Sequence, residues 1–152
     1  MNEYYRTVYD KFELLVRIGF YYTKDDLWVS IENGQAKVGV SDYLQKTSGD
    51  VAFIEVTKAG STVEKGKELG TMESAKATIA LLCPISGRVD KTNDELIAKP
   101  ELINSDPYGK GWLAIIAPSN LDDDLRALLS ADDYYTLMLQ KLQTEHEKLE
   151  SR

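Results

Sequence analysis

The feature that most constrains the fold of this chain is a framework of glycines and a proline around two short apolar segments. Gly66 precedes the first segment and Pro84 follows the second. Such residues end strands and form turns, so residues 70–80 are predicted to form a β-hairpin. Lys76 stands at its tip between two alanines, where an enzyme could approach without a clash. Because a lysine amine on its four-carbon stem can be acylated, the hairpin is predicted to present one attachment point.

The chain from residue 20 to residue 116 is predicted to be rich in short strands. Three of them, with partial alternation of apolar residues, lie at residues 28–31, 36–40 and 51–56. Asn33-Gly34 between the first two is a typical two-residue hairpin turn. Ser41 is expected to cap a helical turn. Many short strands with glycine and proline at the corners indicate two packed sheets or a flattened β-barrel.

Both ends of the chain are predicted to be helical. Over residues 2–18 apolar side chains recur every three or four residues, and Gly19 is a suitable helix stop. Pro118 ends the last strand, and acidic residues begin two helices that lie before and after Ser130. The predicted organisation is an N-terminal helical extension at 1–20, a β-rich domain at 21–118 and a C-terminal helical region at 119–152 packed on it.

Three stretches of the sequence resemble a single protein family. They are Glu73-Ser74-Ala75-Lys76-Ala77, Cys83-Pro84-Ile85-Ser86-Gly87-Arg88-Val89, and Asn93-Asp94-Glu95-Leu96 with the segment 100–113. Taken in this order, they are similar to the lipoyl carriers of the glycine cleavage system H protein family, over about residues 22–135. The resemblance implies a mainly β fold, the lipoyl-domain barrel-sandwich hybrid, and a carrier that is not itself an enzyme.

The resemblance also implies roles for residues of the hairpin. Lipoic acid would be covalently bound to Lys76, and Glu73 would be recognised by the lipoate-attaching ligase or transferase. Ser74, Ala75 and Ala77 complete the lipoylation motif. Biotinyl carriers have methionines on both sides of the lysine, so the flanking alanines argue against biotin. The implied function is a swinging arm that visits separate enzymes.

Two positions depart from the family pattern. The family has an acid just before its tryptophan and another four residues after its lysine, whereas this chain has Leu27 before Trp28, and Ala80. These three residues are candidates for the groove that receives the arm. The aminomethyl group carried in glycine cleavage is cationic, and a cation in a groove needs a counter-charge. The apolar replacements therefore favour an uncharged or sulfur-bearing load.

This departure favours the branch of H-protein-like lipoate-binding proteins that serve a sulfur-oxidation pathway. Their partner is a heterodisulfide-reductase-like complex. One alternative is a glycine cleavage system H protein, with glycine decarboxylase, aminomethyltransferase and dihydrolipoyl dehydrogenase as partners. A second alternative is an interaction module that is never modified.

Composition excludes several other classes of protein. Lys and Arg number 18 against 25 Asp and Glu, and the net charge of −7 argues against nucleic acid or an anionic membrane as partner. The sequence has no cluster of His and Cys with the spacing of metal ligands. Cys83 is the only cysteine, so it cannot form an intramolecular disulfide, and it is expected to be buried rather than redox-active. Without an apolar run of signal-peptide length near residue 1, a cytoplasmic location is expected.

Overall fold

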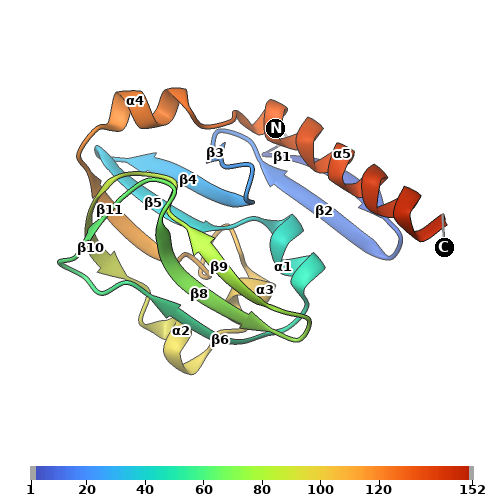
Figure 1. Cartoon of the computed structure of the whole chain (residues 1–152), viewed down its shortest axis with the longest axis horizontal. Helices are drawn as coiled ribbons and strands as arrows, with labels where there is room; N and C mark the ends of the chain where they lie inside the picture. The colour runs from blue at the N-terminus through green and yellow to red at the C-terminus, as the bar shows by residue number, and fades with distance from the viewer. Residues whose placement is uncertain (1–2, 151–152) are drawn as a thin grey trace.

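The structure is a computed structural model that describes residues 3–150, with side chains described as far as residue 145. Its strands form a six-stranded, a three-stranded and a two-stranded sheet (Figure 1). The strands are β1 (Tyr4–Tyr9), β2 (Phe12–Arg17), β3 (Tyr21–Tyr22), β4 (Leu27–Glu32), β5 (Gln35–Val40), β6 (Val51–Val56), β7 (Thr62–Val63), β8 (Glu68–Ser74), β9 (Thr78–Leu82), β10 (Gly87–Thr92) and β11 (Ala114–Pro118). The helices are α1 (Asp42–Ser48), α2 (Glu95–Ala98), α3 (Leu102–Ser105), α4 (Leu121–Arg126) and α5 (Ala131–Glu150).

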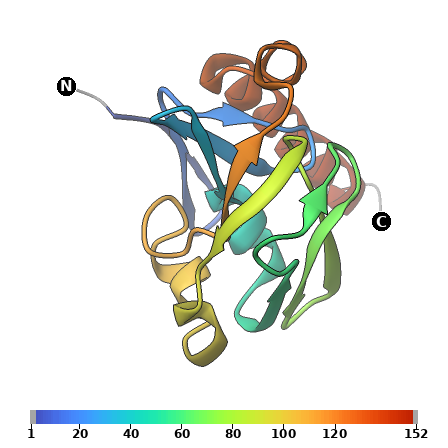
Figure 2. The ribbon, with the colours of Figure 1, turned by 90° about the vertical axis from the view of Figure 1, so that its left-hand side faces the viewer.

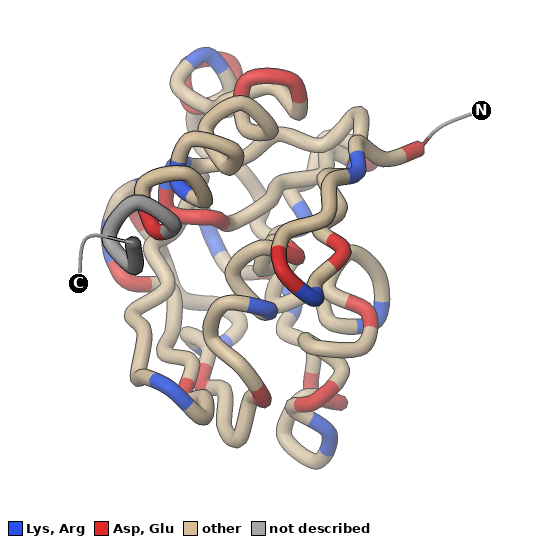
Figure 3. Tube along the Cα trace, turned by 90° about the vertical axis from the view of Figure 1, so that its right-hand side faces the viewer, with Lys and Arg blue, Asp and Glu red and all other residues tan. Residues whose placement is uncertain are grey.

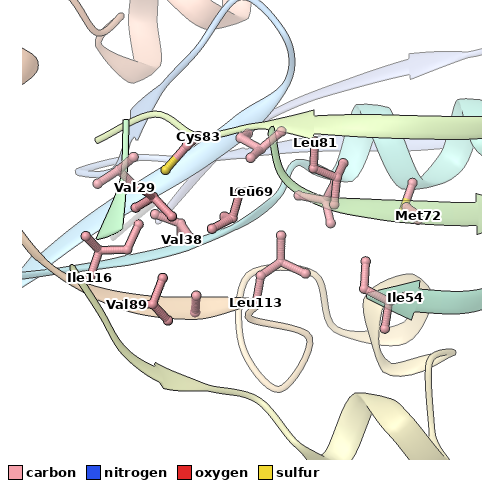
Figure 4. Close-up of a cluster of buried hydrophobic side chains, with 14 of the residues drawn as sticks. Val29, Val38, Ile54, Leu69, Met72, Leu81, Cys83, Val89, Leu113 and Ile116 are labelled. Atoms are coloured by element: carbon pink, nitrogen blue, oxygen red, sulfur yellow. The ribbon is translucent and has the colours of Figure 1, made fainter. Parts of the chain in front are cut away.

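The two larger sheets pack on one apolar core. The six-stranded sheet has the order β3-β4-β5-β11-β10-β7, and the three-stranded sheet has the order β6-β8-β9. Val29 and Val38 from the first meet Leu69 and Leu81 from the second (Figure 4), and all four are fully buried. In the view of Figure 2, α2 and α3 lie at the opposite end of the molecule from α4 and α5. The predicted mainly β sandwich, with helices at the C-terminus, is confirmed.

Local turn and cap signals of the sequence are found where they were predicted. Asn33 and Gly34 connect β4 to β5 with φ angles of 52° and 76°, the left-handed values that a tight hairpin turn requires. Ser41 precedes α1, and its side chain accepts a hydrogen bond from the backbone N–H of Leu44 at 3.2 Å. Both features depend on neighbours in the sequence, which is why the sequence predicts them correctly.

The prediction of an N-terminal helix over residues 2–18 is wrong. β1 and β2 pair as an antiparallel hairpin, with Asp10 in the turn at a φ of 55°. Leu14 and Val16, two residues apart, are the buried pair, so the period of burial is that of a strand. The segment is also rich in Tyr, Val and Phe, which favour strands. One face of the β1–β2 hairpin is buried because α5 packs alongside it (Figure 1).

A second, mostly aromatic core lies between this hairpin, the large sheet and α5. The rings of Tyr22 and Tyr134 stack with centroids 4.4 Å apart and planes 9° apart. Trp28 donates from its Nε1 to the backbone oxygen of Pro107 at 2.9 Å. None of these three aromatic side chains is exposed. The C-terminal helix is therefore an integral part of the packing and joins the hairpin to the sandwich.

A buried polar network ties α5 to the loop before β4. The Asp26 carboxylate accepts hydrogen bonds from the Tyr134 hydroxyl at 2.7 Å and from Lys141 Nζ at 2.8 Å. Ser41 Oγ lies 2.9 Å from the same hydroxyl. Burial raises the pKa of Asp26, and the bonds from Lys141 and Tyr134 oppose this rise. The carboxylate of Asp26 is thus bonded to side chains of α5.

Charges on the side toward which the β8–β9 hairpin projects are mixed. Lys and Arg alternate with Asp and Glu over this side of the molecule (Figure 3).

Candidate functional site

Lys76 lies at the tip of the tight hairpin that joins β8 to β9. The tip is closed by Ser74, whose backbone N–H and side-chain hydroxyl both donate to the carbonyl oxygen of Ala77, at 2.9 and 3.0 Å. Ala75, Lys76 and Ala77 are all exposed. Within the described part of the chain, Lys76 forms no hydrogen bond or ion pair. The predicted tip is found, with a free amine and two methyl side chains beside it.

The tip rests on the loop that follows α1. The backbone N–H of Ala75 donates to the carbonyl oxygen of Asp50 at 2.9 Å. Gly49, at a φ of 81°, comes so close that a Cβ there would lie 3.4 Å from the Cβ of Ala75. This backing holds the three-residue tip at a fixed position relative to the sandwich, while its lysine side chain extends into solvent.

Cross-strand pairing places several side chains of the three-stranded sheet in rows beside the tip. Phe53, Glu73 and Thr78 form one row, and all three are exposed. The next row, about 7 Å farther along the strands, consists of Glu55, Thr71 and Ala80. Side chains paired in this way share one face of the sheet. Of the three groove candidates, Ala80 is exposed, on the same face of the three-stranded sheet as Phe53, Glu73 and Thr78.

Leu27 and Trp28 do not line an open groove, contrary to the prediction. Leu27 is 1% exposed and belongs to the core between the two larger sheets, whereas Trp28 is fully buried in the aromatic core. β4 lies between β3 and β5 and is covered on both faces, so neither side chain reaches the surface. The nearly continuous apolar run of this strand was a signal for two-sided burial.

A cleft of about 180 Å³ lies where β9 ends. It is lined by Thr23, Lys24, Asp25, Lys65, Gly66, Leu82, Cys83, Pro84, Ala127 and Leu128. Its walls are mainly apolar, and two lysines and one aspartate contribute charges. The sequence does not predict this cleft, because the residues that line it come from four separate segments. No periodicity or motif in one segment indicates that the others will join it.

Cys83 is expected to react slowly with thiol reagents. It is 2% exposed, and its Sγ donates to the carbonyl oxygen of Ile85 at 3.1 Å. Burial raises the pKa of the thiol from 9.0 to about 11. At pH 8 the thiolate fraction is then about 100-fold lower. A disulfide reagent should therefore react about 100-fold faster with the chain unfolded in urea. Equal rates for the folded and unfolded chain would contradict the buried position.

The described residues show neither a metal cluster nor a membrane-spanning helix. Among the residues that the structure describes, His, Cys, Asp and Glu side chains form no group of three or more that could hold a metal ion. Over the same residues, no helix has the length and apolar character needed to span a bilayer.

Known proteins match most of the chain. The family model described as "Glycine cleavage H-protein" matches residues 20–141. A probable glycine cleavage system H protein of Pyrococcus abyssi is 44% identical over 123 residues, which cover 80% of this chain and 91% of the relative. The glycine cleavage system H protein of Carboxydothermus hydrogenoformans is 38% identical over 117 residues, or 77% of this chain and 89% of that protein.

A solved structure agrees with the sequence matches. The crystal structure of a glycine cleavage system H protein from Mycobacterium marinum superposes with a TM-score of 0.70 at 31% identity, covering 76% of this chain and 93% of that one. The matched family region begins at residue 20, so the β1–β2 hairpin precedes it. The chain belongs to the glycine cleavage H-protein family, whose members are non-catalytic carriers with lipoate covalently attached to a lysine.

Proposed function

We propose that this chain is the lipoyl carrier of a glycine cleavage system and that Lys76 is the lipoylated residue. The observation that carries the proposal is the geometry of Lys76, an exposed lysine without a partner among the described residues, at a closed hairpin tip. Only methyl side chains stand on either side of it. The names of the relatives support the glycine cleavage assignment.

The residues around Lys76 suit a covalently attached acyl arm. The backbone bond from Ala75 to Asp50 keeps the base of the arm in place. On the outer face of β9, the exposed residue Ala80 has only a small side chain beside the arm. A lipoyl group on the lysine would supply a disulfide that accepts electrons or a transferred group by exchange. Since acylation removes the charge of the lysine, the loaded tip would carry the acid Glu73 without its neighbouring cation.

The proposal includes a division of the chain and a set of partners. Residues 21–118 would form the carrier unit, which the β1–β2 hairpin and the region from 119 onward enlarge. Its partners would be the lipoate-attaching ligase or transferase, glycine decarboxylase, aminomethyltransferase and dihydrolipoyl dehydrogenase. A cytoplasmic location would fit the single buried cysteine.

The test of this proposal is an exchange reaction with a partner enzyme. The lipoylated protein, mixed with a glycine decarboxylase, should support exchange of labelled bicarbonate into glycine. The unlipoylated protein is the control and should support none. If the lipoylated protein supports no exchange with glycine decarboxylases from several organisms that have similar H proteins, the glycine assignment is overturned.

A second candidate function is a sulfur relay with a heterodisulfide-reductase-like complex. It is favoured by one observation, the absence of an acid at the exposed position 80, which removes an expected counter-charge for an aminomethyl cation. In that case the arm would carry sulfur between partner enzymes. Robust glycine–bicarbonate exchange would exclude the sulfur relay as the main function.

Restoring an acid beside the arm should raise the exchange rate. Ala80 is exposed, so we expect Ala80→Asp to change the free energy of unfolding by less than about 0.5 kcal/mol. Its carboxylate would stabilise the aminomethyl cation, and the exchange rate measured with glycine decarboxylase should increase. An unchanged rate would show that the counter-charge does not matter and would remove the support for the sulfur relay.

Leu27→Glu is expected to behave differently from Ala80→Asp. Leu27 is 1% exposed, and a carboxylate there would lie in the core without a cation. We expect this variant to lose roughly 3–5 kcal/mol of stability, as measured by urea unfolding. A variant as stable as the parent chain would mean that position 27 opens to solvent.

A further inference from the structure

The outer face of the three-stranded sheet presents an exposed aromatic side chain beside the lysine hairpin. Phe53 lies on β6 and is 52% exposed, although its neighbour Ile54 is buried. Its pairing partner on β8 is Glu73, which is three residues from Lys76. The opposite face of the same strands fills the core with Ile54 and Met72, so Phe53 is not needed for packing there.

This face also carries acids that are not paired within the described structure. Glu55 and Glu73 are exposed and form no ion pair with a described residue. β6 is one of the two edge strands of its sheet, and α2 packs beside it (Figure 1). An aromatic ring flanked by two carboxylates thus borders the tip on the side of β6. Aromatic anchors in a polar rim are typical of sites where proteins bind one another.

We propose that Phe53, Glu55 and Thr78 join Glu73, whose recognition the family motif already implies, in a docking face for the enzyme that attaches the lipoyl group to Lys76. The inference rests on the proposed modification of this lysine. The attaching enzyme would meet the face with a basic rim for the two glutamates and an apolar pocket for the phenylalanine ring. Opposite charges would speed and orient the encounter, and the ring would contribute most of the affinity.

The position of this face beside the hairpin tip favours the attaching enzyme over the enzymes that react with the lipoyl group once it is attached. Its reaction occurs at Lys76 Nζ, only one four-carbon stem from the backbone. That enzyme therefore has to cover the residues immediately around the tip, and the row Phe53–Glu73–Thr78 is the first row of the sheet. Enzymes that act at the far end of the arm can dock at a distance.

The attachment step itself places no demand on these four residues. The enzyme supplies the lipoyl group as an activated acyl donor. An amide bond forms between Nζ and the acyl carbon, and the bond from that carbon to the donor's leaving group breaks. The leaving group departs with the electron pair, and the nitrogen releases the protons it no longer holds. The docking face acts only by binding the enzyme, so its variants should raise KM more than they lower kcat.

The experiment measures the rate of modification of the full-length unlipoylated chain. A purified lipoate ligase, lipoate and ATP are added, and intact mass is followed over time. We expect Phe53→Thr and Glu55→Lys each to lower kcat/KM about tenfold, the effect of losing about 1.4 kcal/mol of interaction. Val8→Thr is the matched control, because Val8 is 64% exposed but lies on the separate β1–β2 sheet. This control should be modified at the parent rate.

Further measurements separate the possible outcomes. Urea unfolding midpoints equal to that of the parent chain would show that the two variants are folded, as expected for exposed positions. Parent-like modification rates for both variants would overturn the docking face while leaving the proposed function intact. The variants could also be lipoylated at the parent rate but support slower exchange with glycine decarboxylase. This result would overturn the proposal as well, since the face would then bind the decarboxylase and not the attaching enzyme. Mass gain in Lys76→Arg would instead overturn the proposed function.

Discussion

Lys76→Arg is expected to abolish lipoylation of this chain completely. The guanidinium keeps the positive charge and most of the length of the side chain. It stays protonated, however, so it cannot attack the acyl donor as a lysine amine does. Because Lys76 is exposed and has no partner among the described residues, the substitution should leave the fold unchanged. Intact mass after incubation with a lipoate ligase should show one lipoyl group on the parent chain and none on the variant.

The matched control is Lys58→Arg, another exposed lysine on the loop that follows β6. It should gain one lipoyl group as the parent chain does. A lipoyl group on the Lys76→Arg variant would mean that a different lysine is the attachment site. No gain in the parent chain, with an active ligase present, would favour the unmodified interaction module.

Trp28→Ala is expected to lower the free energy of unfolding strongly. Trp28 is fully buried, its Nε1 donates to Pro107, and its ring lies 4.9 Å from that of Phe20. Gly39 on the neighbouring strand leaves room for the indole, since a Cβ there would lie 2.4 Å from its ring atoms. Removing the ring would empty a space that these neighbours are shaped to fill. We expect a loss of about 3–5 kcal/mol in the free energy of unfolding.

Urea unfolding measures this loss directly. With a slope of about 2 kcal/mol per molar urea, the midpoint should fall by about 2 M. Leu139→Ala on α5 is the control, because Leu139 is 38% exposed and its truncation should cost far less. Unfolding midpoints that fall equally in both variants would mean that the aromatic core is not the tightly packed region that the structure describes.

The features that the sequence predicts well depend on residues close together in the chain. The hairpin around Lys76, the Asn33-Gly34 turn and the Ser41 cap each involve partners within a few positions. Their physical causes are the φ preferences of glycine and asparagine and the hydrogen bond of a capping hydroxyl. The motif around Lys76 then supplies the family, which the comparisons confirm.

The wrong predictions concern surfaces that distant segments create. An amphipathic spacing over residues 2–18 cannot distinguish a helix from a strand pair until α5 is present to cover it. Leu27 and Trp28 were expected at a groove, yet Leu27 lies in the core between the two larger sheets and Trp28 lies in the aromatic core that includes side chains of α5. In both cases burial is decided by a partner that lies far away in the sequence.

The amino-acid sequence by itself therefore determined the lysine-bearing hairpin, the β-rich sandwich and the family, since short-range backbone preferences and motifs encode them. Only the tertiary structure decided which residues around that hairpin are available to a partner. It buried Leu27, tied Asp26 to Lys141, and left Phe53 and Ala80 exposed on one sheet face. The reason is that exposure depends on the packing of whole elements, and packing joins residues that no local pattern connects.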